Sequence, residues 1–531
     1  MKNPLAFLAL LLLVVTACAQ TGAPPGTMNF DLPADPASLN PLFIHPDASA
    51  TEQELARLAF EPFIDLDPQG RAVPALLAVI PSRKNGDIST DGRTLTYHLR
   101  RGVKWQDGVP VSGSDVLYTL HAILDPRNPV RSHEGYELID RAWSPKTNVV
   151  IFHLTKAWAP AVQTFFSYGA SPQFVLPAHI LRTQGPLIHA PFNAAPVGDG
   201  PYMFVKWARG DRLVYTANPR YWRGEPKIRR LNIRIVPDPS TNLTLIGAGE
   251  IDFNLLAPSQ RAIVARTRGI AFRVVPTSTV AGVAMNTRRP PLNDVRVRRA
   301  LAMSIDRQAI SRKITLGLYP VADMAQPQFS WAFDPRVHLP AYDPKAADAL
   351  LDAAGWKRGR DGMRAKNGKP FTLVYVQFPE SNTGVRVATV IQSELQSRGI
   401  AMTVKSISLA QLYLPSARGG ALASGKFDMA YVPWPMGADP DDSALLACRG
   451  TSNYMRYCNP KVDRLEAQAL SATTQSARKA DYSRIARIVA AEVPIVYLFY
   501  ADYTYAYRNR LQGFYPNAFL PTWNAGAWSL K

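Results

Sequence analysis

The residues that could support catalysis are scattered along this chain rather than arranged in catalytic patterns. Its eight histidines include no HExxH sequence and no pair spaced i, i+4, so nothing supports a catalytic zinc site. No GxSxG nucleophile motif occurs. Ser476 and Lys479 fit the pattern SxxK, but they lie in a predicted amphipathic helix with no KTG downstream, which favours a chance match. We therefore expect a protein that is not an enzyme, with an exported hydrolase as the alternative.

Two further polar clusters invite a chemical interpretation. Asp439, Asp441 and Asp442 lie close together, but aspartates grouped around a proline more often form turns. Gly198 and Gly200 could belong to a phosphate-binding loop, yet a third glycine is missing and the surrounding sequence predicts a hairpin. Neither cluster predicts a cofactor, and we expect no bound cofactor or metal ion.

The N-terminus has the features of an export signal. Lys2 precedes an apolar run over residues 5–15 that is too short to span a bilayer. The sequence VTAC at residues 15–18 resembles the lipobox of bacterial lipoproteins, and an ordinary signal peptide is the alternative. We expect residues 1–17 to be removed, Cys18 to carry lipid, and residues 18–27 to form a tether. The protein would then be anchored at the outer face of a bacterial membrane, facing the periplasm or the cell exterior.

Two cysteines, Cys448 and Cys458, remain in the body of the chain if Cys18 is lipidated. Export places them in an oxidising compartment, and neither a CxxC pair nor a neighbouring histidine indicates a metal site. We predict a disulfide between them that closes a surface loop.

The formal net charge of +19 raises the question of nucleic-acid binding. The arginines are spread along the whole chain, however, with no dense basic run and no RNA-binding signature. Export also separates the protein from nucleic acid, so we expect no nucleic-acid partner. The charge is interpreted as a basic surface that anionic lipid headgroups would attract.

The elements that could position a site are clearest between residues 91 and 124. Leu95, Tyr97 and Leu99 alternate with polar residues, which predicts a half-buried strand. Ser112 precedes Asp115 by three residues, the spacing of a capping box at the start of a helix. The sequence therefore predicts a unit of strand, turn and helix.

The rest of the chain alternates between short strands and helices, as an α/β fold requires. Asn293 is the predicted cap of a helix that contains Val297 and Leu301. Further strands are predicted over 149–154, 202–206, 231–235, 371–378 and 427–434, and further helices over 158–168, 241–252, 342–355, 385–398, 461–470 and 477–491. Residues 53–66 are predicted to form a helix that runs toward a strand.

Several motifs resemble one known family. Residues 95–120 (LTYHLRRGVKWQDGVPVSGSDVLYTL), 196–238 and 286–310 (NTRRPPLNDVRVRRALAMSIDRQAI) resemble, in order, the hallmarks of the family 5 extracellular solute-binding proteins. These proteins are the peptide- and nickel-binding receptors of ABC importers. Because several motifs occur in the family's order, the resemblance covers nearly everything after residue 28.

The resemblance implies a two-lobed α/β fold of the periplasmic-binding-protein kind (type II), with the extra domain of the peptide-binding group. Residues 28–50, 190–280 and 495–531 would build lobe I, residues 51–189 its extra domain, and residues 281–494 lobe II. The β-rich segments 274–286 and 494–507 would cross between the lobes and act as a hinge.

The resemblance also implies a monomer that captures a peptide or peptide-like solute between its lobes and passes it to the importer's membrane subunits. A sensor or a chaperone of the same fold is the alternative. The residues expected at the ligand are Asn40 of the entry loop, Phe378, Trp434, Met436 and Asp439.

The chain departs from its dipeptide-binding relatives at two positions. Those receptors place an aspartate three residues after the tryptophan of a lobe II strand, but Gly437 stands three residues after Trp434. They also carry an arginine before a proline that follows a lobe II strand, where this chain has Phe378. Since a buried charge without a partner is costly, free dipeptides are expected to be poor ligands unless Asp439 takes the aspartate's role.

Overall fold

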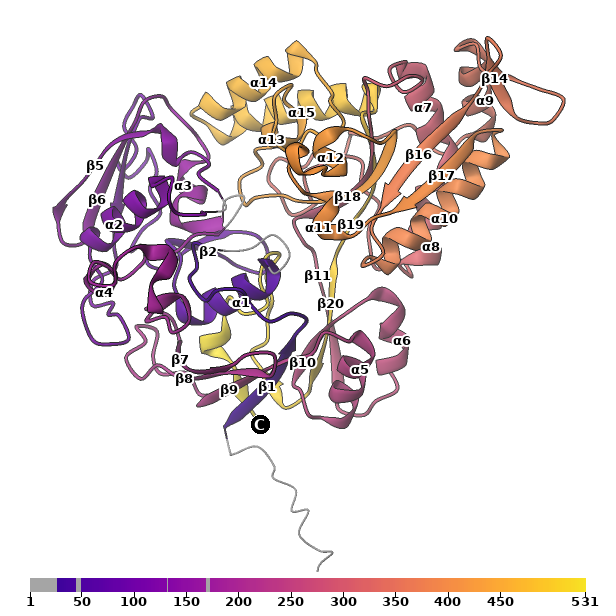
Figure 1. Cartoon of the computed structure of the whole chain (residues 1–531). Helices are drawn as coiled ribbons and strands as arrows, with labels where there is room; N and C mark the ends of the chain where they lie inside the picture. Colours follow the sequence, from indigo (N-terminus) through magenta and orange to yellow (C-terminus); the bar gives the residue numbers. More distant parts are fainter. Residues whose placement is uncertain (1–25, 44–48, 131, 169–171) are drawn as a thin grey trace, which may run out of the picture.

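The computed structural model describes residues 26–43, 49–130, 132–168 and 172–531. The predicted signal peptide and Cys18 lie outside the described residues. The chain forms two lobes, with strands β1 and β7–β9 in one and strands β16–β19 in the other, as Figure 1 shows. The predicted two-lobed α/β fold is therefore confirmed.

Lobe I is built on two sheets, one ordered β1–β9–β8–β7 and one ordered β10–β20–β11. The first contains β1 (Thr27–Leu32), β7 (Tyr202–Ala208), β8 (Arg212–Ala217) and β9 (Arg230–Ile235). The second contains β10 (Phe253–Leu256), β11 (Ile270–Val275) and β20 (Tyr503–Arg508), next to α5 (Pro239–Ala248), α6 (Arg261–Val264), β21 (Leu511–Gln512) and β22 (Ser529–Leu530). β20 is the middle strand of its sheet and pairs antiparallel with both neighbours.

A third group of elements lies at the left of Figure 1, within the stretch assigned to the extra domain. It contains the sheet β4–β6–β5 and the helix α2: β4 (Thr94–His98), β5 (Ile139–Lys146), β6 (Val149–Leu154), α2 (Gly113–Leu124), with α1 (Ser49–Ala59), β2 (Ile64–Leu66), β3 (Ala72–Pro74) and α4 (Ala178–Leu181) nearby. Leu95 and Tyr97 are buried, which confirms the predicted alternation. The carboxylate of Asp115 accepts a hydrogen bond from the Ser112 backbone N–H at 2.9 Å, so the capping box is also present.

The helix predicted over 158–168 is wrong, because only α3 (Ala161–Gln163) forms there. Phe166 has a positive φ of 52° and its neighbours are also non-helical. Its backbone N–H donates to the Tyr136 hydroxyl at 2.7 Å, and its carbonyl accepts from the Phe63 N–H at 2.7 Å. These tertiary hydrogen bonds and the burial of the aromatic rings replace the helical bonds that local sequence favours.

Lobe II surrounds a mixed five-stranded sheet with the order β17–β16–β18–β12–β19. Its strands are β12 (Thr279–Met285), β16 (Thr372–Gln377), β17 (Ala401–Ser406), β18 (Met429–Pro435) and β19 (Ile495–Tyr500). A separate small three-stranded sheet contains β13 (Lys357–Arg358), β14 (Arg364–Lys366) and β15 (Lys369–Pro370). Its helices are α7 (Val295–Ser304), α8 (Arg307–Ile314), α9 (Pro344–Ala353), α10 (Asn382–Ser397), α11 (Leu409–Leu412), α12 (Ala421–Ser424), α13 (Ser443–Leu446), α14 (Pro460–Ser471) and α15 (Gln475–Glu492).

One predicted helix cap in lobe II is displaced by a residue. Asp294, not Asn293, caps α7, and its carboxylate accepts from the Arg296 N–H at 2.9 Å. The Asn293 N–H is already bonded to the Arg289 carbonyl in the preceding turn. The helix therefore begins one residue later than predicted.

Two extended segments connect the lobes, at β11–β12 and at β19–β20, and Figure 1 shows β11 and β20 rising side by side from lobe I. The crossings are bonded to each other, since Thr277 Oγ1 donates to the Ala501 carbonyl at 3.0 Å. Because β19 pairs with β12 in the lobe II sheet, the second crossing lies after Tyr500 and not at residue 495. The other domain boundaries stay predictions.

The lobes also touch away from these crossings. The Ala159 N–H donates to the Leu470 carbonyl at 2.7 Å, and the Ala438 N–H donates to the Tyr168 carbonyl at 3.0 Å. Ala159 and Tyr168 belong to the stretch assigned to the extra domain, whereas Leu470 and Ala438 belong to lobe II. The structure therefore has a closed conformation, in which the stretch assigned to the extra domain contacts lobe II directly.

Candidate functional site

A cavity of about 590 Å³ lies between the loops around residues 132–164 and lobe II. The first side contributes Ser132, Glu134, Pro160 and Thr164, and lobe II contributes the remaining walls. Those walls come from α11 and the residue after it, from the end of β18 and the loop that follows, from α13, and from the loop before α14. The residues are Leu409, Tyr413, Pro433–Gly437, Asp439, Asp441, Asp442, Ala444, Leu445, Thr451, Ser452 and Tyr454.

The end of β18 supplies the apolar wall of the cavity. Trp434 and Met436 both line it, and their expected contact with a ligand stays a prediction. Trp434 is only 4% exposed, and its indole N–H has no hydrogen-bond acceptor within the described part of the chain. Tyr413 and Tyr454 add two aromatic rings whose centroids are 6.0 Å apart.

Phe378 and Asn40 lie elsewhere in the structure. Phe378 is buried in the lobe II core, where its ring lies 5.9 Å from that of Tyr431. Asn40 is buried in lobe I, donates to Asn193 Oδ1 at 2.9 Å and accepts from the Leu42 N–H at 3.0 Å. Neither lines the cavity, so their predicted contact with ligand stays a prediction.

Asp439 lines the cavity but is already paired. Arg478 of α15 donates to both of its carboxylate oxygens, at 2.7 and 2.5 Å, and to the Tyr482 hydroxyl at 3.1 Å. The Asp439 and Arg478 side chains are each 8% exposed. A bidentate pair of this kind neutralises both charges, so Asp439 has little capacity left for a ligand ammonium group.

Three more carboxyl groups gather beside Asp439. The pKa of Asp442 is raised to about 6, mainly by burial, and the charge of the neighbouring Asp441 acts in the same direction. Burial also raises the pKa of Glu466 well above its usual value, with Asp442 as the next cause. Glu466 and Asp442 hydrogen-bond to each other, which requires a proton between the two carboxyl groups.

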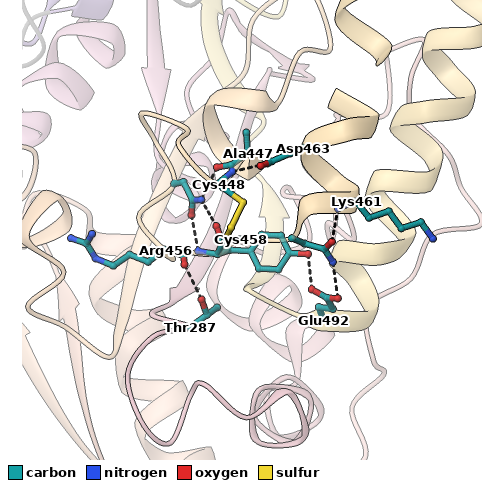
Figure 2. Close-up of a disulfide and its surroundings, with 11 residues drawn as sticks. Thr287, Ala447, Cys448, Arg456, Cys458, Lys461, Asp463 and Glu492 are labelled. Carbon is teal, nitrogen blue, oxygen red and sulfur yellow. Dashed lines mark hydrogen bonds between the residues drawn. A yellow bond between two sulfur atoms is a disulfide. The ribbon is translucent and has the colours of Figure 1, made fainter. Parts of the chain in front are cut away.

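The disulfide predicted from the sequence is present. Cys448 and Cys458 are bonded, and the intervening loop carries Thr451, Ser452 and Tyr454 to the cavity wall. Figure 2 shows the Cys448 N–H donating to Asp463 of α14, at 2.8 Å. The disulfide therefore closes the loop that forms this wall of the cavity, and the hydrogen bond from Cys448 attaches the loop to α14.

Sequence reasoning found the β18 residues but missed several other walls of the cavity. Glu134, Tyr413 and Tyr454 come from loops that are distant in the sequence, and no local pattern singles them out. The sequence pattern of Asp441 and Asp442 predicts a role in turns. They do take part in turns, since Asp441 Oδ1 accepts from the Ser443 N–H at 2.9 Å, but they also line the cavity.

Within the described ranges, no group of three His, Cys, Asp or Glu side chains is arranged to hold a metal ion. No helix in the same part of the chain is long and apolar enough to cross a membrane.

Comparison with known families identifies the fold and its role. Residues 73–456 match the family described as bacterial extracellular solute-binding proteins, family 5. The chain belongs to this family. The family consists of binding proteins, and the cavity between the two lobes is the corresponding candidate site of this family 5 protein.

The relatives of this family 5 protein span nearly its full length. It is 28% identical to Protein XP55 of Streptomyces lividans, over 86% of this chain and 81% of that protein. It is 27% identical to Di/tripeptide-binding protein 2 of Pseudomonas aeruginosa, over 95% of each chain. Among solved structures, NikA from Brucella suis in complex with Fe(III)-EDTA superposes with a TM-score of 0.84, at 22% identity, and covers 95% of this chain and 100% of that chain.

Proposed function

We propose that this protein captures a peptide or peptide-like solute in the cavity between its lobes and delivers it to an ABC importer. The observation that carries the proposal is the cavity itself, lined by aromatic residues and enclosed by two parts of the chain that meet through backbone hydrogen bonds. The di/tripeptide-binding relative from Pseudomonas aeruginosa supports a peptide ligand. The protein acts as a monomer and without catalysis.

Free dipeptides are poor ligands in this proposal. Arg478 neutralises Asp439, Gly437 replaces the aspartate of the dipeptide receptors, and Phe378 replaces their arginine. A ligand ammonium or carboxylate enclosed without a partner costs several kcal/mol, on the order of a whole ordinary binding free energy.

A screen of short peptides and their blocked derivatives tests the proposal. We expect at least one to stabilise the purified protein by about 2.7 kcal/mol at a concentration about a hundred times its Kd. Because the crossings at residues 275–279 and 500–503 act as a hinge, small-angle scattering should record an expanded empty form that contracts when this ligand is added. Absence of stabilisation by every peptide in the screen would contradict the peptide assignment.

We also propose that Cys18 is the lipidated N-terminus of the mature protein. The VTAC sequence before the tether supports this assignment. Wild-type protein is then expected in the membrane fraction, and Cys18→Ser in the soluble fraction, with the same melting temperature. Recovery of soluble wild-type protein that begins at Ala19 or a later residue would contradict it.

A further inference from the structure

We propose that a second pocket, in lobe I, binds the phosphate group of an anionic phospholipid headgroup. The pocket has a volume of about 380 Å³ and lies beside β11, β20 and β21. It shares no lining residue with the cavity between the lobes. The proposal is therefore independent of the peptide ligand, whereas its choice of a membrane lipid rests on the proposed anchor at Cys18.

An arginine without an acceptor forms one wall of this pocket. Arg273 of β11 is half-buried, and its Nε–H is buried without a hydrogen-bond acceptor in the described part of the chain. Within the same ranges its guanidinium forms no ion pair, unlike the buried Arg57 and Arg478. A buried donor left without an acceptor costs free energy, which an oxygen of a bound ligand would recover.

Two tyrosine rings hold the Arg273 guanidinium in place. Its central carbon lies 4.5 Å from the centroid of the Tyr515 ring and 5.9 Å from the centroid of the Tyr507 ring. Tyr507 is itself fixed in the sheet, where β20 pairs with β11. Rings that stack on the face of a guanidinium leave the N–H groups at its edge available. The arginine is therefore oriented in advance for an anion that offers two oxygens.

The pocket carries positive charge that the protein does not neutralise. Lys531 lines it together with Arg273, and no Asp or Glu side chain belongs to the described lining. The nearby Asp252 is fully buried and already pairs with Arg510, through both carboxylate oxygens at 2.5 and 2.9 Å. An anion bound in the pocket would therefore meet two cations and no competing carboxylate side chain.

The pocket lies at the end of lobe I where the folded chain begins. The Lys531 N–H donates to the Arg510 carbonyl at 2.9 Å, and Arg510 in turn pairs with Asp252. Asp252 accepts from the Asn29 N–H of β1 at 2.9 Å. Figure 1 accordingly shows the C-terminus marked beside β1. The pocket and the first strand thus share one end of lobe I.

This end would face the membrane if Cys18 carries lipid. The chain from Cys18 to Gly26 spans at most about 30 Å even when fully extended. Arg229 and Arg230 are exposed next to Gly26 and add positive charge there. Anionic headgroups attract such a basic surface, and a phosphodiester offers the charge and the two free oxygens that the Arg273 fork requires. We therefore assign the pocket to a lipid phosphate.

Vesicle flotation with the full-length Cys18→Ser protein, which lacks the anchor, tests this assignment. Vesicles of phosphatidylcholine alone are compared with vesicles of equal parts phosphatidylcholine and phosphatidylglycerol. We expect binding only to the vesicles that contain phosphatidylglycerol. Sodium phosphate is titrated into the same protein by isothermal titration calorimetry, which detects a site for free phosphate without a membrane.

Charge-conserving variants distinguish the pocket from diffuse electrostatic attraction. Arg273→Lys keeps the charge but loses the planar fork, so it should weaken vesicle binding at least about tenfold. Arg299→Lys, at an exposed arginine of α7 in lobe II, is the matched control and should change binding by less than about twofold.

A second variant tests the ring contact. Tyr515→Leu, at a residue that is 50% exposed, removes one ring from the guanidinium and should weaken binding about threefold. Melting temperatures of all variants, made in the Cys18→Ser protein, establish that they are folded.

Loss of vesicle binding in Arg273→Lys, with Arg299→Lys unaffected, supports the headgroup site. Equal binding by these two variants would show that diffuse charge holds the protein on the membrane, and it overturns the site. Phosphate binding that depends on Arg273, without binding to phosphatidylglycerol vesicles, overturns the lipid assignment in favour of free phosphate. Binding of neither overturns the pocket as an anion site. The peptide screen is separate, and its failure would leave the headgroup site standing.

Discussion

Replacing Arg57 by methionine is expected to lower the free energy of unfolding by about 3–5 kcal/mol. Arg57 lies in α1 and its side chain is 1% exposed. Its guanidinium donates to Asp65 Oδ2 at 2.8 Å and to Glu61 Oε1 at 3.0 Å. Methionine would fill much of the space but would remove the closest cation of two buried carboxylates. Removing one partner of a buried ion pair leaves the other charge uncompensated, which is strongly destabilising.

The surroundings of these carboxylates offer little compensation. The Tyr168 hydroxyl donates to Asp65 at 2.8 Å, and the Tyr221 hydroxyl donates to Glu61 at 2.6 Å. Burial, followed by the charge of Glu61, raises the pKa of the adjacent Asp199 to about 8. Arg223 remains 3.9 Å from Glu61 Oε2 and compensates part of that charge, so the loss of the arginine falls mainly on Asp65, which would have to take up a proton to become neutral.

Denaturant unfolding at neutral pH measures this effect. Arg127→Met is the matched control, since Arg127 pairs with Asp125 on the surface, where its side chain is 87% exposed, and such pairs contribute at most about 1 kcal/mol. A loss below about 1 kcal/mol for Arg57→Met would show that the network is not needed for stability.

Replacing Arg478 by methionine is expected to cost about 3 kcal/mol of stability and to improve the binding of free dipeptides about tenfold. The substitution leaves Asp439 ionised on the cavity wall without its partner. A dipeptide ammonium group could then take the place of the guanidinium, in the manner implied by the resemblance to dipeptide receptors.

A double-mutant cycle separates the two effects. Asp439→Asn combined with Arg478→Met removes the unpaired charge, so it should recover part of the lost stability and lose the gain in dipeptide affinity. Unfolding curves and calorimetric titrations with Ala-Phe measure both quantities. Tight dipeptide binding by wild-type protein, or no gain in Arg478→Met, would contradict the role given to this pair.

Much of the fold could be predicted because its signals are local. The Ser112–Asp115 capping box is formed by side chains only three residues apart. The strand β6 coincides with its prediction for the same reason, since alternation is read from adjacent residues. The helix predicted over 158–168 was wrong because of long-range contacts. At Phe166, hydrogen bonds to Tyr136 and Phe63 replace the helical hydrogen bonds that the local sequence favours.

The candidate site was predictable only in part. The family resemblance indicated Trp434 and Met436, which follow directly from the strand that carries them. It gave no means of seeing that Asp439 is held by Arg478, which is 39 positions later in the chain. The charge state of the cavity depends on that pairing, and pairing across helices is not encoded in any local pattern.

The position of β20 has a consequence for the order in which the protein assembles. The strands and helices of lobe II run without interruption from β12 to β19, so all of its core is available before the last residues are synthesised. The sheet β10–β20–β11 of lobe I, however, receives its middle strand only from residues 503–508. During N-to-C-terminal synthesis and export, lobe II can therefore fold before β20 is available. Until then, the edges of β10 and β11 that pair with β20 remain unpaired. Lobe I, whose first strand is synthesised first, is therefore completed only when β20, near the C-terminal end of the chain, pairs with β10 and β11.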